Sequence, residues 1–248
     1  VKREQIAVGN GSNELLDMIA QVFLGPGTEA VMGKHSFAVY KLATMAMNAK
    51  IIEVDMPAPA YNYDLKAMRA AVNEKTRIVF LANPNNPTGA YYTEAEIREF
   101  LKKVPQNVLV FLDEAYAEFA TAPDYPNMAK FVGEYSNLFV NRTFSKIYGL
   151  AGLRVGYAFG STEVIRALWK VKPPFDVNQA AQVAAIAALG DKEHVQATRK
   201  MNAEGIDVLT REFSALGLKV LPTQANFICV RIGERAKELV AFLESNGM

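Results

Sequence analysis

The sequence is poor in cysteine and histidine, and it has almost no excess of charge of either sign. It contains 1 Cys and 2 His among 248 residues, and 27 Lys+Arg against 26 Asp+Glu give a formal net charge of +1. The single cysteine, Cys229, excludes an internal disulfide and is typical of a reducing compartment. Its apolar surroundings predict a core position rather than a nucleophile. Balanced charge predicts no basic face, so neither nucleic acid nor an anionic membrane is an expected partner.

Long hydrophobic runs and metal-ligand patterns are also missing. The longest apolar runs, such as residues 183–189, are far too short to cross a bilayer. No charged-then-apolar signal segment opens the chain, so we expect a soluble, cytoplasmic protein. His35 has no second His, Cys or acid at metal spacing, so no metal site is predicted. Because the chain starts at Val1 and a helix and turn lead up to Met248, we expect a fragment of a longer protein.

Apolar strand-like runs alternate with helical patterns along the chain. Continuous apolar runs at residues 77–82, 108–112 and 138–140 predict buried parallel strands. We therefore expect an α/β fold, a mostly parallel sheet sandwiched by helices. Residues 1–196 are predicted to form a large domain, and residues 197–248 the start of a smaller α/β C-terminal domain.

Polar residues gather where these strands are predicted to end. The turn at residues 83–89 holds two prolines and a glycine and presents the Asn86 amide at the edge where α/β sheets bind ligands. Asp113 ends the next strand, Tyr116 follows three residues later, and Glu114 is expected to point away. An apolar run before an acid also resembles the magnesium-binding strand of P-loop ATPases. The G-x-x-x-x-G-K-[ST] loop of those proteins is absent, which favours Asp113 facing a cationic ring nitrogen.

The stretch at residues 141–160 carries a lysine in an unusual setting. Lys146 lies between a hydroxyl residue and apolar neighbours. A desolvated lysine has a depressed pKa and can attack a carbonyl group to form a Schiff base. Thr143, Ser145 and Arg154 would suit a phosphate group beside that amine.

A glycine loop at residues 9–14 precedes an amphipathic helix. Ser12 or Asn13 is the predicted N-cap. Free backbone N–H groups and the helix dipole at such a start bind anions. The loop is not a dinucleotide fingerprint, because Glu14 stands at its third glycine position.

Four segments in this order carry a family resemblance: GNGSNELL, NPNNPTG, FLDEAY and TFSKIYGLAGLRVGY. Together they resemble the fold-type I pyridoxal-phosphate aminotransferases, most closely the histidinol-phosphate aminotransferase branch, over essentially the whole chain. The resemblance implies pyridoxal 5'-phosphate as cofactor. It implies that Lys146 would bind it covalently and move a proton, and that Asp113 would keep the pyridine nitrogen protonated. Tyr116 and Asn86 would hydrogen-bond the 3′ oxygen of the ring.

The same resemblance assigns the remaining site residues. Phe37 would stack on the ring, where a tyrosine is often found in the family. The phosphate would be held by Gly11, Ser12, Asn13, Thr143, Ser145 and Arg154. Asn226 would lie near the substrate. A homodimer is implied, and the substrate arginine, the N-terminal lid and a tyrosine from the neighbouring subunit would lie beyond the ends of this chain.

The implied reaction transfers the amino group of L-histidinol phosphate to 2-oxoglutarate in histidine biosynthesis. Three alternatives stay open at this point: an aromatic-amino-acid aminotransferase, a threonine-phosphate decarboxylase, and a non-catalytic pyridoxal-phosphate module that senses a ligand.

Overall fold

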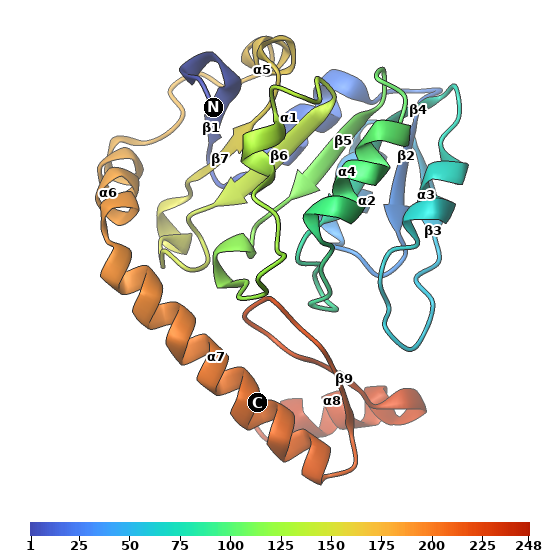
Figure 1. Cartoon of the computed structure of the whole chain (residues 1–248), viewed down its shortest axis with the longest axis vertical. Coiled ribbons are helices and arrows are strands. Elements are labelled where there is room, and N and C mark those ends of the chain that lie inside the picture. The colour runs from blue at the N-terminus through green and yellow to red at the C-terminus, as the bar shows by residue number, and fades with distance from the viewer.

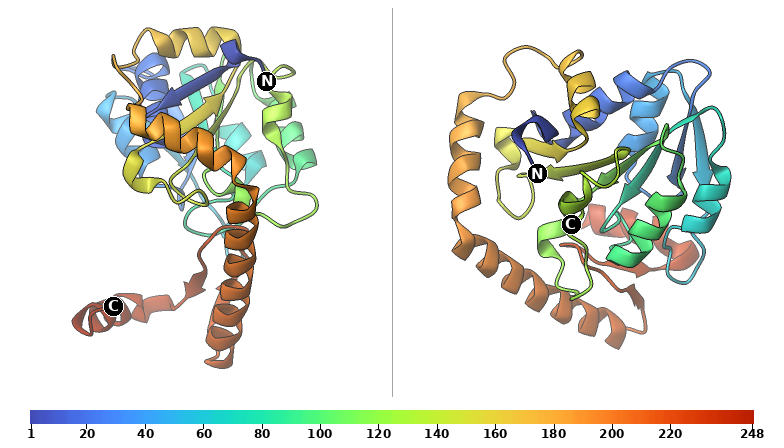
Figure 2. Two further views of the ribbon diagram at one scale, coloured as in Figure 1. Left: turned by 90° about the vertical axis from the view of Figure 1, so that its left-hand side faces the viewer. Right: turned by 45° about the horizontal axis from the view of Figure 1, so that its top comes forward.

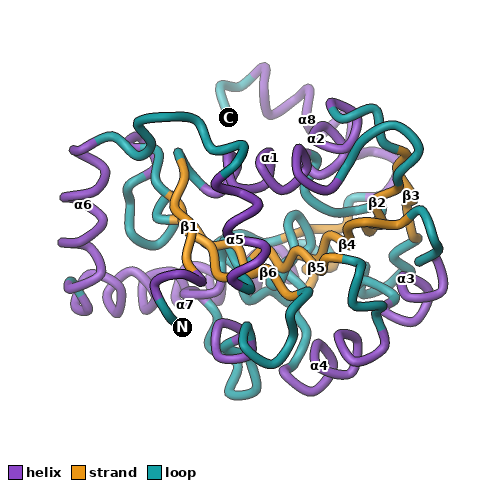
Figure 3. Tube along the Cα trace, turned by 90° about the horizontal axis from the view of Figure 1, so that it is seen from above, coloured by secondary structure: helices purple, strands orange, loops and turns teal.

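The computed structural model describes residues 1–248 and is built around one seven-stranded sheet with helices on both faces (Figure 1, Figure 3). The strand order is β1-β7-β6-β5-β4-β2-β3. Neighbouring strands from β6 to β3 are parallel, whereas β7 runs antiparallel to both β1 and β6. The predicted mostly parallel sheet is therefore confirmed. The strands are β1 (Ile6–Gly9), β2 (Glu29–Gly33), β3 (Lys50–Val54), β4 (Thr76–Ala82), β5 (Leu109–Asp113), β6 (Leu138–Thr143) and β7 (Gly156–Phe159).

Eight α-helices connect or follow the strands. They are α1 (Ser12–Phe23), α2 (Val39–Ala46), α3 (Leu65–Ala71), α4 (Glu94–Lys103), α5 (Thr162–Trp169), α6 (Gln179–Gly190), α7 (Lys192–Ala215) and α8 (Ala236–Ser245). Helix α4 begins with a capping box, in which Thr93 and Glu96 each satisfy the other's backbone N–H. No helix is long and apolar enough to span a membrane.

Alternation along the strands divides the interior into two cores. Phe80 and Phe111 pack with α1, α2 and α5 on one face of the sheet. Leu81 and Leu112 pack with α3 and α4 on the other face. Because side chains along a strand alternate between faces, Asp113 at the end of β5 lies on the same side as Phe111. The alternation thus directs this carboxylate towards α1 and α2.

The N-cap of α1 differs from the expected one. Gly11 is the N-cap, with φ +82°, and no side chain accepts a hydrogen bond from the first turn. Ser12 is already the first helical residue, so the prediction of Ser12 or Asn13 as the cap is wrong. A left-handed φ is open to glycine without steric cost, so Gly11 makes the sharp turn from β1 into α1.

The C-terminal part of the chain leaves the large sheet. Helix α7 extends well beyond it, towards the antiparallel pair β8 (Lys219–Leu221) and β9 (Cys229–Arg231) and helix α8 (Figure 1, Figure 2). The loop between β8 and β9 returns to the large sheet, where the Gln224 carboxamide oxygen accepts the Thr121 N–H at 2.7 Å. The domain boundary at residues 196/197 falls inside α7 and stays a prediction. Cys229 is only half-buried, so the predicted core position is wrong for this residue.

We expect Gly156→Ala to destabilise the protein where β7 meets the start of α1. A Cβ at Gly156 would lie 2.3 Å from the Ser12 backbone nitrogen and 2.6 Å from the Gly11 carbonyl carbon. Backbone cannot yield as a flexible side chain can, so the free energy of unfolding in urea should fall by about 1–3 kcal/mol. Gly152→Ala is the matched control, since a Cβ there meets no atom within 4 Å. Equal stability of the two variants would contradict the proposed close approach.

Candidate active site

A cavity of about 510 Å³ opens at the carboxyl ends of the central strands. It lies where β4, β5 and β6 end, the edge at which open α/β sheets bind ligands. Every predicted site residue except Gly11 and Asn226 lines it: Ser12, Asn13, Phe37, Asn86, Asp113, Tyr116, Thr143, Ser145, Lys146 and Arg154. The structure thus brings the predicted residues together, and their roles towards a ligand stay predictions.

Asp113 is the most deeply buried carboxyl group of the cavity. Its side chain ends β5, and the residue is 7% exposed. The Tyr40 hydroxyl donates to Oδ2 at 2.9 Å, and the Ala115 N–H donates to Oδ1 at 3.2 Å. Burial raises the pKa of Asp113 to about 6, although these two hydrogen bonds and the charge of Lys146 oppose the rise. Asp113 is therefore mainly an anion at neutral pH, ready to face a cationic group.

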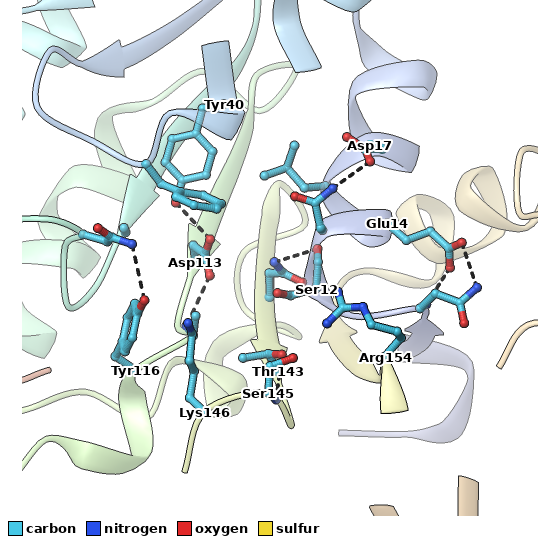
Figure 4. A pocket seen from close by; sticks show the side chains of 18 of the residues that line it. Ser12, Glu14, Asp17, Tyr40, Asp113, Tyr116, Thr143, Ser145, Lys146 and Arg154 are labelled. Atoms are coloured by element: carbon cyan, nitrogen blue, oxygen red, sulfur yellow. Dashed lines mark hydrogen bonds between the residues drawn. The ribbon is translucent and has the colours of Figure 1, made fainter. Parts of the chain in front are cut away.

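Lys146 also lines the cavity, with its amine directed towards Asp113 in Figure 4. Its Nζ is 5.1 Å from the centroid of the Tyr116 ring. The expectation of a desolvated lysine is wrong for this structure, because Lys146 is exposed. It follows β6 on a loop at the mouth of the cavity. The same side chain also lines a second hollow, formed with α7 and the 226–228 segment that contains Asn226.

Asn86 and Tyr116 meet on one side of the cavity. The Asn86 carboxamide donates to the Tyr116 hydroxyl oxygen at 3.3 Å. The turn that carries Asn86 is fixed by its neighbour Asn85, which accepts from the Tyr63 hydroxyl at 2.7 Å and donates to the Thr88 hydroxyl at 2.8 Å. The polar turn is therefore rigid, and it presents one amide next to a phenol as expected.

The opposite side of the cavity forms a cradle for an anion. Arg154 reaches over Gly11 so closely that a Cβ at Gly11 would lie 2.3 Å from its Nη2. The Arg154 guanidinium therefore lies beside the uncapped N–H groups at the start of α1, so both could contact the same anion. Thr143 and Ser145 add hydroxyl groups, and the Ser145 N–H donates to the Thr143 hydroxyl at 3.0 Å.

The acids at this end of the cavity are already paired with asparagines. Glu14 accepts from the Asn10 backbone N–H at 2.7 Å, and Asp17 accepts from the Asn13 side chain at 2.9 Å. Burial raises the pKa of Asp17. The Asn13 side chain is thus engaged along α1, and the backbone N–H groups of the first turn are the donors that face an anion.

Several cavity residues were not predicted from the sequence, and two of them, Tyr40 and Asn141, make contacts that bear on the site. The Tyr40 hydroxyl donates to the Asp113 carboxylate, and the position of Tyr40 three residues after Phe37 was the available signal. Asn141 donates to the Ser12 carbonyl oxygen at 3.2 Å, while its buried Oδ1 has no partner in the protein. An orphaned buried oxygen beside the cradle indicates a place prepared for a further polar group. No cluster of three His, Cys, Asp or Glu could hold a metal ion.

The sheet and its cavity define an α/β protein that binds a polar ligand at its strand ends, with an anion cradle, a buried carboxylate and an amine. The family model for aminotransferase class I and II matches residues 1–244. The chain belongs to this family.

The similar proteins share one description. The chain is 45% identical over 244 residues to histidinol-phosphate aminotransferase 2 of Hydrogenovibrio crunogenus, covering 98% of this chain and 65% of that protein. It is 47% identical over 249 residues to histidinol-phosphate aminotransferase of Moorella thermoacetica, covering 100% of this chain and 64% of that protein. The chain therefore spans slightly less than two thirds of the length of these curated relatives.

Solved structures agree on the fold. Histidinol-phosphate aminotransferase from Sinorhizobium meliloti, crystallised with pyridoxal-5'-phosphate, superposes with a TM-score of 0.91 at 29% identity, covering 97% of this chain and 65% of that chain. An aspartate aminotransferase from Thermus thermophilus superposes with a TM-score of 0.87 at 24% identity, covering 95% and 67%. The predicted aminotransferase fold is confirmed.

We expect Asp113→Asn to stabilise the cofactor-free protein at pH 8 but not near pH 4. The folded-state pKa of about 6 lies above the ordinary value of 3.8, so stability from this group is complete below pH 4 and is lost as the pH rises through 6. Asparagine cannot ionise, so the variant avoids this loss. Its free energy of unfolding at pH 8 should therefore be about 1–3 kcal/mol higher than that of the unchanged protein. Urea titrations at both pH values measure it. Asp207→Asn, exposed on α7, is the control, and an equal gain in both variants at pH 8 would refute the burial effect.

Proposed function

We propose that the protein containing this chain is a pyridoxal 5'-phosphate-dependent aminotransferase. The observation that carries the proposal is one cavity holding a fixed anionic carboxylate, a free primary amine and an anion cradle. Membership of the aminotransferase class I and II family and the cofactor named for the Sinorhizobium meliloti structure support it. When bound, the cofactor supplies an electron sink for the carbon next to the reacting nitrogen.

The residues of the cavity fit the three polar parts of this cofactor. Asp113 offers a carboxylate to the protonated ring nitrogen, with its own orientation set by two hydrogen bonds. Asn86 and Tyr116, already hydrogen-bonded to each other, offer donors to the 3′ oxygen. Phe37 lines the cavity with a ring that would stack on the pyridine.

The phosphate group would bind in the cradle beneath Arg154. Its contacts there are the backbone of Gly11, Ser12 and Asn13 at the start of α1, the hydroxyls of Thr143 and Ser145, and the Arg154 guanidinium. A guanidinium and a helix N-terminus both favour a doubly negative phosphate. Lys146 has an exposed amine that can bind a carbonyl carbon and, once displaced, accept and return a proton.

For the substrates, we propose L-histidinol phosphate as amino donor and 2-oxoglutarate as acceptor, as a step of histidine biosynthesis. The relatives at 45% and 47% identity are named for this donor.

We also propose a homodimer and a cytoplasmic location. Helix α6 supports the dimer, because Val183, Ile186 and Leu189 are 57–74% exposed on it, and an apolar helix needs cover. The free, half-buried thiol of Cys229 is typical of a protein in a reducing compartment. Finding the protein only in the secreted fraction of its cells would exclude a cytoplasmic location.

We expect Ile186→Lys to weaken the dimer about tenfold or more in sedimentation velocity, because it places a charge on the apolar surface of α6. Asn107→Lys, in an exposed turn before β5, adds the same charge elsewhere and should leave association unchanged. A protein that is monomeric at all concentrations would rule the dimer out.

We expect borohydride reduction in the presence of pyridoxal 5'-phosphate to label Lys146 alone. Peptide mapping should find one pyridoxyl group, and Lys146→Ala should lose it while keeping its fold by circular dichroism. Lys130→Ala, which removes an exposed lysine outside the cavity, should be labelled like the unchanged protein. Persistent labelling of the Lys146→Ala variant would refute the assignment.

The donor can be tested in the same preparation by adding amino compounds without an acceptor and following the cofactor absorbance. L-histidinol phosphate should convert the cofactor to its amino form, and L-phenylalanine should do so at least tenfold more slowly. Preference for L-phenylalanine would instead indicate an aromatic-amino-acid aminotransferase. Release of carbon dioxide from threonine phosphate would indicate a decarboxylase, and no conversion by any amino compound would indicate a ligand-sensing module.

A further inference from the structure

Tyr40 is a buried polar residue for which the proposed function has no assigned role. It lies in the first turn of α2, is 0% exposed, and points its hydroxyl at the Asp113 carboxylate. Its ring stacks on Phe80 with centroids 4.8 Å apart and planes 6° apart, and it meets the edge of Phe111 at 6.3 Å. Packed on two sides by aromatic rings from β4 and β5, the phenol is fixed in place, so its hydroxyl has one available direction.

The hydrogen bond runs in one sense only. Burial and the negative charge of Asp113 raise the pKa of Tyr40 well above its ordinary value, so the phenol keeps its proton. It therefore donates to Oδ2, while the Ala115 N–H donates to Oδ1. A carboxylate has about four acceptor positions. Two of them are used by the protein, and the others stay free towards the cavity that Asp113 lines.

Tyr40 also connects the carboxylate with the part of the cavity that carries Phe37. The two aromatic residues are three positions apart, with ring centroids 5.6 Å apart and planes at 85°. The Tyr40 backbone N–H donates to the Phe37 carbonyl oxygen at 3.1 Å, so the turn that leads into α2 carries both side chains. Both residues line the cavity. A shift of this turn would move the aromatic wall and the donor to Asp113 together.

We propose that Tyr40 is a positioning residue that keeps Asp113 ionised and in one orientation by donating its phenolic proton to Oδ2. Its value to a ring nitrogen rests on the proposed function, but its effect on Asp113 does not, because the hydrogen bond lies wholly within this chain. Removing a hydrogen bond that stabilises the charged form favours the neutral acid. Loss of the hydroxyl should therefore raise the acid dissociation midpoint of Asp113.

The test is an NMR titration of the cofactor-free protein with ¹³C-labelled aspartate carboxyl groups, in which Asp113→Asn identifies the resonance. In the unchanged protein the pKa of Asp113 is expected at about 6. Tyr40→Phe should raise it by about one to two units, the equivalent of one hydrogen bond to a charged group. Because no cofactor is present, failure of the proposed function cannot produce or hide this shift.

Tyr92→Phe is the matched control. Tyr92 is also buried, and its hydroxyl donates to the Tyr63 backbone carbonyl instead of to Asp113. Its loss should leave the Asp113 midpoint within about 0.3 units, because the carboxylate keeps both of its donors. An unchanged midpoint in Tyr40→Phe overturns the proposal. An equal rise in both variants also overturns it, since general loosening of the core would then be the cause.

A second measurement covers the case in which Tyr40→Phe does not fold. Incorporation of 3-fluorotyrosine at position 40 keeps the ring and hydroxyl and places a ¹⁹F probe beside the carboxylate. Its resonance should titrate with the midpoint of Asp113, and the titration should disappear in Asp113→Asn. A resonance that does not move between pH 4 and pH 8 would overturn the proposal.

Discussion

The burial of one negative charge at the end of β5 is the constraint on which the candidate site depends. Asp113 loses most of its hydration there, and this burial raises its pKa to about 6. Hydrogen bonds from the Tyr40 hydroxyl and the Ala115 N–H stabilise the ionised carboxylate and offset part of the cost of burial. A partner cation would relieve the cost further, and this is why the proposed function pairs the carboxylate with a cationic ring nitrogen. Under that proposal, Asp113 is a case of stability given up at a functional position.

The neighbouring acid shows how the sheet separates two charges that adjoin in sequence. Glu114 is fully buried on the opposite face, where the Arg142 guanidinium lies 2.6 Å from its Oε2. Arg142 comes from β6, whose register pairs Asp113 with Asn141. Since alternate residues of a strand face opposite ways, the ion pair on one face of the sheet fixes Asn141 and Thr143 on the other, where they line the cavity. The ion pair between Glu114 and Arg142 on one face of the sheet thereby helps to set the positions of Asn141 and Thr143 on the face that carries the cavity.

The sequence predicted much of this arrangement, for reasons that can be traced to single residues. Apolar runs located the central strands, and polar residues at their ends located the cavity, because parallel strands deliver their carboxyl ends to one edge. It also predicted that Glu114 faces away from Asp113. The N-cap of α1 was misplaced by one or two residues, because the preference for a capping side chain was outweighed by the sharp turn that only Gly11 makes easily. Tyr40 was not assigned to the site, because its hydroxyl partner is 73 residues away in the sequence.

The exposure of Lys146 is the most informative departure from expectation. The groups suited to holding a cofactor lie on fixed parts of the fold: Asp113 on a central strand, Asn86 on a tightly bonded turn, and the anion cradle at a helix start. Lys146 instead lies on the loop after β6, where it lines two hollows. Its neighbour Ile147 is buried, and the Ile147 carbonyl is hydrogen-bonded by His194 of α7 at 2.9 Å. The backbone beside the lysine is therefore anchored, while its side chain is exposed. In the proposed function the amine binds a carbonyl carbon, leaves it and then carries a proton, and an exposed side chain on an anchored loop leaves room for these successive positions.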